Sequence, residues 1–210
     1  MISKSLVRGA LAMAAGTVVL LTAVSCGGES AESLLTSAKS YLAKKDAKTA
    51  IIQIKNALQK NPDLPEGRYL LGRALLDSGD AAGAELELRK ARALQYSADQ
   101  VSAALGRSLL MQGQFKKVVE EFGAATLTAA ASKADLDTSL GAAHAALGNR
   151  DAAEKSIFGA LAAVPDFAPA QLAQARLQAS KGDIEDALTL TGKLLVAHPD
   201  NYEGDRKSVV

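Results

Sequence analysis

The chain has 210 residues, of which 48% are hydrophobic and 22% are charged, and its formal net charge is +1. This length suits one or two domains, and so balanced a charge does not favour nucleic acid as a partner. Aromatic residues make up only 4%, tryptophan is absent, and a single cysteine excludes an internal disulfide. Because the hydrophobic excess is alanine and leucine, which favour helices, we expect an all-helical protein.

Residues 1–25 have the order of a secretory signal. Lys4 and Arg8 precede an uncharged stretch over residues 9–24, and small residues follow. A basic start, an apolar middle and a small-residue exit are typical of such signals. The stretch is shorter than the roughly 20 residues that a membrane span needs. The alternative is an N-terminal anchor helix that stays uncleaved.

The segment from Ala23 to Gly27, which reads Ala-Val-Ser-Cys-Gly, resembles the bacterial lipobox. The family pattern usually has leucine where Ala23 stands. The resemblance implies that Cys26 carries a diacylglycerol, that the signal is removed and that the new amino group is acylated. Residues 26–30 then form a short tether, and Gly27, which is not aspartate, favours the outer membrane of a Gram-negative cell, with the protein facing the periplasm. The alternative is ordinary secretion with a free thiol.

After the tether, the sequence repeats with a period of 34 residues. Equivalent positions are occupied by the pairs Ala50 and Ala84, Ala57 and Ala91, Gly79 and Gly113, and Gly148 and Gly182. The pattern predicts a first helix, a turn with glycine just beyond its end, and a second helix with two alanines that allow close helix contact. One such unit cannot bury its apolar face alone, so several must stack.

This plan resembles the tetratricopeptide repeat. Five copies cover residues 31–64, 65–98, 99–133, 134–167 and 168–201, within a repeat domain assigned to residues 31–204. The third copy is the loosest, with Val118 where alanine is usual and one extra residue before the fourth. The resemblance implies an all-α solenoid of about five helical hairpins that binds other proteins. A plain bundle of amphipathic helices would not explain the fixed period.

Signal, lipobox and repeats together resemble the start of the PEP-CTERM system TPR-repeat lipoproteins. The segments that carry this likeness are residues 57–62, 71–76 and 113–119. The resemblance implies a membrane-tethered scaffold in exopolysaccharide export or in exosortase-dependent protein sorting. Two alternatives are a lipoprotein that assembles pilus or outer-membrane proteins, and the binding arm of a larger enzyme.

The last six residues, 205–210, do not continue the repeat that should begin near Tyr202. Their codons can be read as GAT CGG AAG AGC GTC GTG, which resembles a sequencing adapter. We therefore expect a non-native tail and a natural protein that continues.

The first helices line the concave face in this kind of repeat, and their ninth positions are mostly basic. We call Lys39, Arg73, Arg107 and Arg176 the basic ladder; the fourth copy has Ala142 there. Guanidinium groups form bidentate pairs with carboxylates. The ladder therefore predicts a groove for an acidic peptide or polymer, and the alternative is a solvated helix face.

The remaining chemistry-bearing residues favour structural roles. His144 stands where a packed aromatic residue is common, and His198 precedes a proline at a repeat corner; Tyr41, Tyr69 and Phe122 are expected in the core. No metal-binding or nucleotide-binding motif occurs. We therefore expect no enzyme activity, no cofactor and no metal, with proteins and the membrane as partners.

Overall fold

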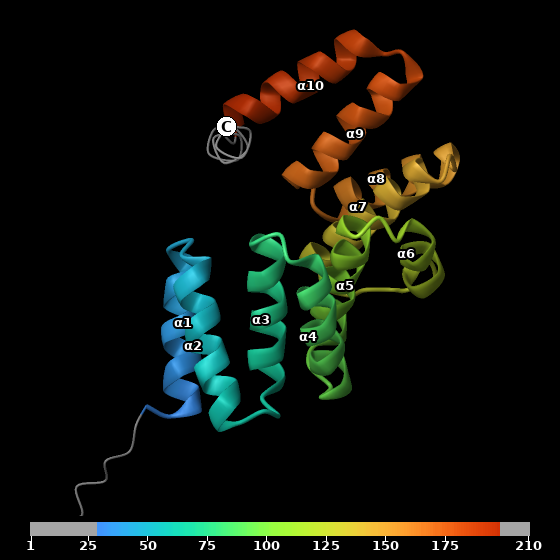
Figure 1. The fold of residues 1–210 in the computed structure, drawn as a ribbon. Helices are drawn as coiled ribbons and strands as arrows, with labels where there is room; N and C mark the ends of the chain where they lie inside the picture. The colour runs from blue at the N-terminus through green and yellow to red at the C-terminus, as the bar shows by residue number, and fades with distance from the viewer. Residues whose placement is uncertain (1–28, 198–210) are drawn as a thin grey trace, which may run out of the picture.

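The computed structural model describes residues 29–197, and this part of the chain consists of ten α-helices without a strand. The helices form five antiparallel hairpins that stack along the chain (Figure 1). This confirms the predicted all-α solenoid. The hairpins are α1 (Ala31–Ala43) with α2 (Ala47–Lys60), α3 (Pro65–Asp77) with α4 (Ala81–Ala93), α5 (Ala98–Met111) with α6 (Phe115–Phe122), α7 (Ala130–Ala146) with α8 (Arg150–Ala163), and α9 (Ala168–Lys181) with α10 (Ile184–Ala197). The signal segment, Cys26, and the tail over residues 205–210 lie outside the described residues.

The turns between paired helices are set by local residues. Four turn glycines have a positive φ between 68° and 96°, a conformation that glycine adopts without steric cost: Gly79, Gly113, Gly148 and Gly182. After Gly79 the next helix begins at a side-chain cap, where Asp80 accepts a hydrogen bond from the amide of Gly83 at 2.9 Å. The predicted turns therefore fall where the sequence indicated.

The core runs along the seam between first and second helices. The alanines predicted to allow close contact are fully buried: Ala50, Ala57, Ala84, Ala91, Ala153 and Ala160. Larger side chains between them, such as Ile54 and Leu88, are also fully buried. One apolar cluster joins α1, α2 and α3, and another continues from α3 to α7. The core is therefore continuous across hairpins, as expected of a solenoid.

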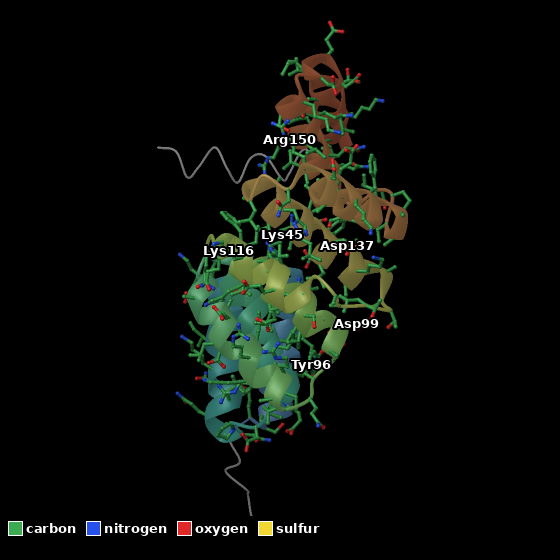
Figure 2. The ribbon with its side chains drawn as sticks, turned by 90° about the vertical axis from the view of Figure 1, so that its right-hand side faces the viewer. Lys45, Tyr96, Asp99, Lys116, Asp137 and Arg150 are labelled. Atoms are coloured by element: carbon green, nitrogen blue, oxygen red, sulfur yellow. The ribbon has the colours of Figure 1, made fainter. Side chains whose placement is uncertain are left out.

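The third hairpin departs from this plan. Its second helix, α6, has 8 residues, whereas α4 has 13. A loop over residues 123–129 leads to α7. Asp99, near the start of α5 (Figure 2), accepts hydrogen bonds from the amides of Thr128 and Ala129, both at 2.7 Å. Helix α7 therefore begins at Ala130, one turn before the predicted start of the fourth repeat, and it packs closely against α5.

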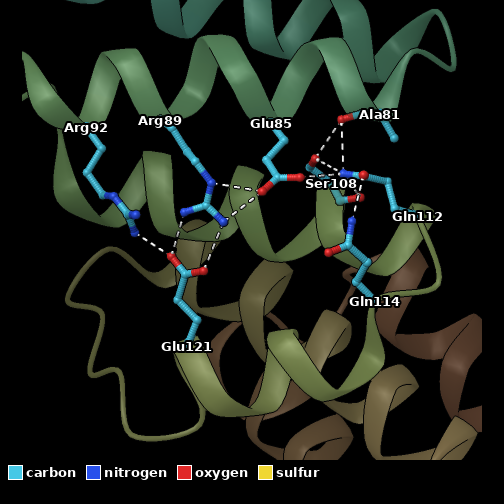
Figure 3. A network of polar contacts seen from close by, with 8 residues as sticks. All are labelled: Ala81, Glu85, Arg89, Arg92, Ser108, Gln112, Gln114 and Glu121. Carbon is cyan, nitrogen blue, oxygen red and sulfur yellow. Dashed lines mark hydrogen bonds and ion pairs between the residues drawn. The ribbon is translucent and has the colours of Figure 1, made fainter.

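A polar network joins the second hairpin to the third (Figure 3). The two terminal nitrogens of the Arg89 guanidinium group, Nη1 and Nη2, donate to the carboxylate of Glu121 on α6 at 3.2 Å. Arg92 also pairs with Glu121. Glu85 accepts from Arg89 at 2.8 Å and from Gln112 at 2.9 Å. Burial raises the pKa of Glu121, but the hydrogen bonds and charges of its two arginines outweigh this and hold it below its usual value. Ion pairs thus link the short helix α6 to α4, in addition to the apolar cluster that Val118 and Phe122 share with Leu88.

Candidate ligand groove

The first helices of four hairpins surround a groove of about 680 Å³. Its walls are formed by α3, α5, α7 and α9, because the hairpin stacking places these helices next to one another. Three of its lining residues are arginines of the basic ladder, namely Arg73, Arg107 and Arg176. The period of 34 residues thus brings together side chains that are far apart in the sequence.

The three arginines differ in their contacts. Arg73 donates a hydrogen bond to the hydroxyl of Tyr69 at 2.9 Å, and its guanidinium lies 5.9 Å from the centre of that ring. Arg107 approaches Asp77 only loosely, at 3.8 Å. Arg176 makes no ion pair with any residue in the described range 29–197. None of the three is committed to a close carboxylate within the described chain, so each can take one from a ligand.

Lys39, the fourth member of the ladder, is placed differently. It lies on α1 and forms an ion pair of 2.6 Å with Glu66 of α3. It does not line the groove that contains the three arginines. At this repeat position the first hairpin therefore has a lysine whose charge is balanced by Glu66.

Asp135 of α7 is the acidic residue that lines the groove. Burial raises the pKa of this carboxyl above its ordinary value of 3.8, and the charge of Asp77 acts in the same direction. The charges of Arg107 and Arg73 oppose the shift without cancelling it. Three arginines against one aspartate leave the groove with an excess of positive charge.

Apolar and aromatic side chains complete the lining. Tyr69 is only 8% exposed and stacks on Tyr96, with ring centres 4.8 Å apart. Met111 and Leu172 contribute aliphatic surface. Sequence reasoning assigned Tyr69 to the core, and it is buried, but it also lines the groove. Its spacing four residues before Arg73, on the same helix face, was the available signal.

The described residues offer little other chemistry. Within residues 29–197 there is no cluster of metal-ligating side chains. Over the same range, no helix has the length and apolar character needed to cross a membrane. His144 is partly buried on α7, and Phe122 is buried in the core. The part of the chain that the structure describes is thus a helical solenoid with a basic, partly aromatic groove.

Comparison with known proteins bears on the fold. No protein-family model matches the chain, and no curated protein gives a significant match. Among solved structures, a thermophilic TPR protein of Thermus thermophilus, TTC0263, superposes with a TM-score of 0.62 at 23% identity, covering 83% of this chain and 94% of its own. MamA from Desulfovibrio magneticus RS-1 gives 0.61 at 20% identity, covering 83% and 98%. PilW, a type IV pilus biogenesis factor, gives 0.63 at 18% identity, covering 81% and 78%.

These likenesses show that the chain has the tetratricopeptide-repeat fold. At these identities they are evidence for the fold alone.

Proposed function

We propose that the chain is a scaffold that binds acidic segments of other proteins in its concave groove. The observation that carries the proposal is the convergence of Arg73, Arg107 and Arg176 on one groove, with no close carboxylate partner among the described residues. A peptide carboxylate can accept two parallel hydrogen bonds from a guanidinium group. The aromatic and aliphatic lining supplies apolar contact for the rest of the peptide.

The groove is tested by changing Arg73, Arg107 and Arg176 together to Gln. Binding of a short labelled oligoglutamate peptide, followed by fluorescence anisotropy, should weaken at least about tenfold, which corresponds to about 1.4 kcal/mol. Folding should be unchanged, because exposed charges contribute little to stability. Binding to the parent should also weaken with added salt.

A matched control removes the same charge elsewhere. Lys55, Lys116 and Lys155 are exposed residues on the second helices, and their change to Gln should leave peptide binding within about twofold of the parent. Equal losses in both triple variants would mean that only net charge matters, and the groove assignment would fail. Preferential capture of an acidic polysaccharide over the peptide would mean that the ligand is a polysaccharide and not a protein.

The proposal includes a membrane tether at Cys26. The lipobox resemblance supports it, since a lipidated cysteine followed by a short glycine-containing tether would hold the repeats close to a membrane. Several acyl chains together anchor a protein stably, because each buried methylene adds about 0.8 kcal/mol. Cys26→Ser should therefore move the protein from the membrane fraction to the soluble fraction. Retention of the variant in membranes after a salt wash would contradict the tether.

The cellular role we favour is exopolysaccharide export or exosortase-dependent sorting, supported by the resemblance of the N-terminal region and first repeats to PEP-CTERM system lipoproteins. A second candidate is pilus or outer-membrane protein assembly, favoured by the structural likeness to PilW. Gene neighbours distinguish them: exosortase and glycosyltransferase genes favour the first role, and pilus genes the second.

A further inference from the structure

A second pocket lies beside the groove, at the junction of the fourth and fifth hairpins. It has a volume of about 400 Å³, and small-ligand pockets range from about 300 to 1,000 Å³. Ala142, Ala173 and Arg176 line both this pocket and the ligand groove, so the two are continuous. We call it the side pocket, and its lining from α7, α8 and α9 also includes Ala145, Arg150, Ile157, Leu177 and Ser180.

The side pocket is open because α7 has alanine where the two preceding first helices have leucine. The amide of each turn glycine donates a hydrogen bond to the carbonyl three residues earlier, which belongs to Leu76 in α3, Leu110 in α5 and Ala145 in α7. Leu76 is 2% exposed and belongs to the apolar cluster that continues into α5. Ala145, at the same repeat position, is exposed and lines the pocket instead.

The facing helix α9 is also small at this point. Two residues before the turn glycine, α5 has Met111, whereas α9 has Ser180. The junction of α7 with α9 therefore lacks both of the large side chains that α3 and α5 bring to their own junction. The pocket that remains has an apolar lining, because Ile157 and Leu177 are buried beneath it.

Two arginines line the side pocket, and neither is neutralised within the described chain. Arg150 is the first residue of α8 (Figure 2), and Arg176 lies on α9. Neither forms an ion pair within residues 29–197, and none of the described residues that line the pocket is acidic. Guanidinium groups pair with carboxylates. The side pocket therefore favours a ligand that carries a carboxylate beside a bulky apolar group.

We propose that the side pocket receives a bulky aliphatic side chain of the bound peptide, while Arg176 holds a neighbouring acidic residue. This inference rests on the proposed function, since Arg176 belongs to the peptide groove as well. It specifies the partner more closely, as a segment with leucine, or a side chain of similar size, close to glutamate or aspartate. The peptide then supplies the leucine that α7 lacks, and burial of that side chain favours binding.

The test compares two peptides that differ in one side chain. In one, the central residue of the oligoglutamate peptide is leucine, and in the other it is alanine. The leucine peptide should bind the parent at least about fivefold more tightly, because a buried leucine side chain removes more apolar surface from water than a methyl group does.

Filling the side pocket should abolish this preference. Ala145→Leu places there the side chain that α3 and α5 carry at the same position. The variant should bind the leucine and alanine peptides alike, and its affinity for the all-glutamate peptide should stay within about twofold of the parent. Ala146→Leu is the matched control, because Ala146 is exposed on α7 and lines neither the pocket nor the groove. This control should keep the preference for leucine.

The outcomes separate this inference from the proposed function. A parent that binds oligoglutamate but does not distinguish leucine from alanine would overturn the inference and leave the arginine groove standing. A parent that binds none of the three peptides would overturn both. A preference for leucine that persists in Ala145→Leu would place the leucine side chain elsewhere and overturn the inference.

A probe that needs no peptide tests the pocket itself. Anilinonaphthalene sulfonate joins a negative group to apolar rings, and it reports exposed apolar surface. Its fluorescence should rise with the parent and with Ala146→Leu, and should be clearly lower with Ala145→Leu. Equal fluorescence for all three proteins would mean that the side pocket does not take an anionic apolar group, and would overturn the inference.

Discussion

The second and third hairpins share a sequence plan but pack differently. Both first helices carry a leucine-glycine pair, Leu71-Gly72 in α3 and Leu105-Gly106 in α5. Gly72 lies against Leu88 of its own second helix, α4. Gly106 lies against Leu136 of α7, which belongs to the next hairpin. The leucine-glycine pair therefore allows a close helix contact in both hairpins. The length of the second helix determines whether the contacting helix is the second helix of the same hairpin or the first helix of the next one.

The short helix α6 explains the difference. It ends at Phe122, five residues shorter than α4, and the early turns of α7 take the place of the missing end. Polar contacts hold α6 and α7 in these positions: Glu121 binds α4, and Asp99 binds the loop before α7. Asp135, the neighbour of Leu136, lines the ligand groove, as Gln100 and Pro169 do at the same position of their repeats.

The largest expected effect comes from Leu136→Ala. If Leu136 serves as core for the third hairpin, its truncation should lower the free energy of unfolding by about 2–5 kcal/mol, as should Leu88→Ala in the second. Both side chains are at most 1% exposed. Chemical denaturation measures the loss, and Leu86→Ala, at a residue 57% exposed, serves as the control with a change within about 0.5 kcal/mol. A loss below about 1 kcal/mol for Leu136→Ala would mean that α7 does not replace the missing part of α6.

A smaller effect separates the two glycines. A Cβ at Gly72 would lie 2.6 Å from the Cγ atom of Leu88, whereas one at Gly106 would meet only the terminal Cδ1 methyl of Leu136, at 2.7 Å. A terminal methyl can move more readily than a branch point. Overpacking costs about 1–3 kcal/mol, and alanine recovers up to about 1 kcal/mol of helix propensity.

We therefore expect Gly72→Ala to lower the free energy of unfolding by about 1–2 kcal/mol. Gly106→Ala should be close to neutral. Denaturation curves of the two variants at one pH and temperature give the order directly. The reverse order would show that the α5–α7 contact is the more rigid of the two.

The regular hairpins could be predicted from the sequence because their signals are local. Glycine at a left-handed turn and alanine in the contact between two helices depend only on their immediate surroundings, so the period predicted the hairpin α3–α4 well. The turn at Lys45, with a φ of 59°, has the same left-handed backbone although it lacks glycine. At the third hairpin, by contrast, α7 takes the place of the end of α6, and this depends on tertiary packing. Val118 and the extra residue marked the place, but neither shows which helix fills the gap.

The candidate groove was predictable to a similar extent. Arg73, Arg107 and Arg176 share a repeat position, so the period alone brings them to one face. Lys39 shares it too, but its pairing with Glu66 depends on the distance between α1 and α3, which no repeat position reveals. Tyr69 plays two roles, because one side of its ring packs in the core while its hydroxyl meets Arg73.

The smallest predicted effect concerns Asp135, the acidic residue that lines the groove. Asp135→Asn removes the negative charge that faces Arg73 and Arg107 without changing the size of the side chain. Binding of the oligoglutamate peptide should strengthen about two- to fivefold, or about 0.4–1 kcal/mol.

The Asp135→Asn variant should also be slightly more stable near neutral pH, since the folded state raises the pKa of Asp135 above 3.8 and so disfavours its charged form. That penalty is absent below the unfolded pKa and grows as the pH rises through the folded value. The stability difference between variant and parent should therefore shrink on acidification. Asp137→Asn, two residues along α7 and outside the groove lining, is the control and should leave peptide binding unchanged. Weaker binding by Asp135→Asn would mean that Asp135 orients the arginines for the ligand and does not compete with it.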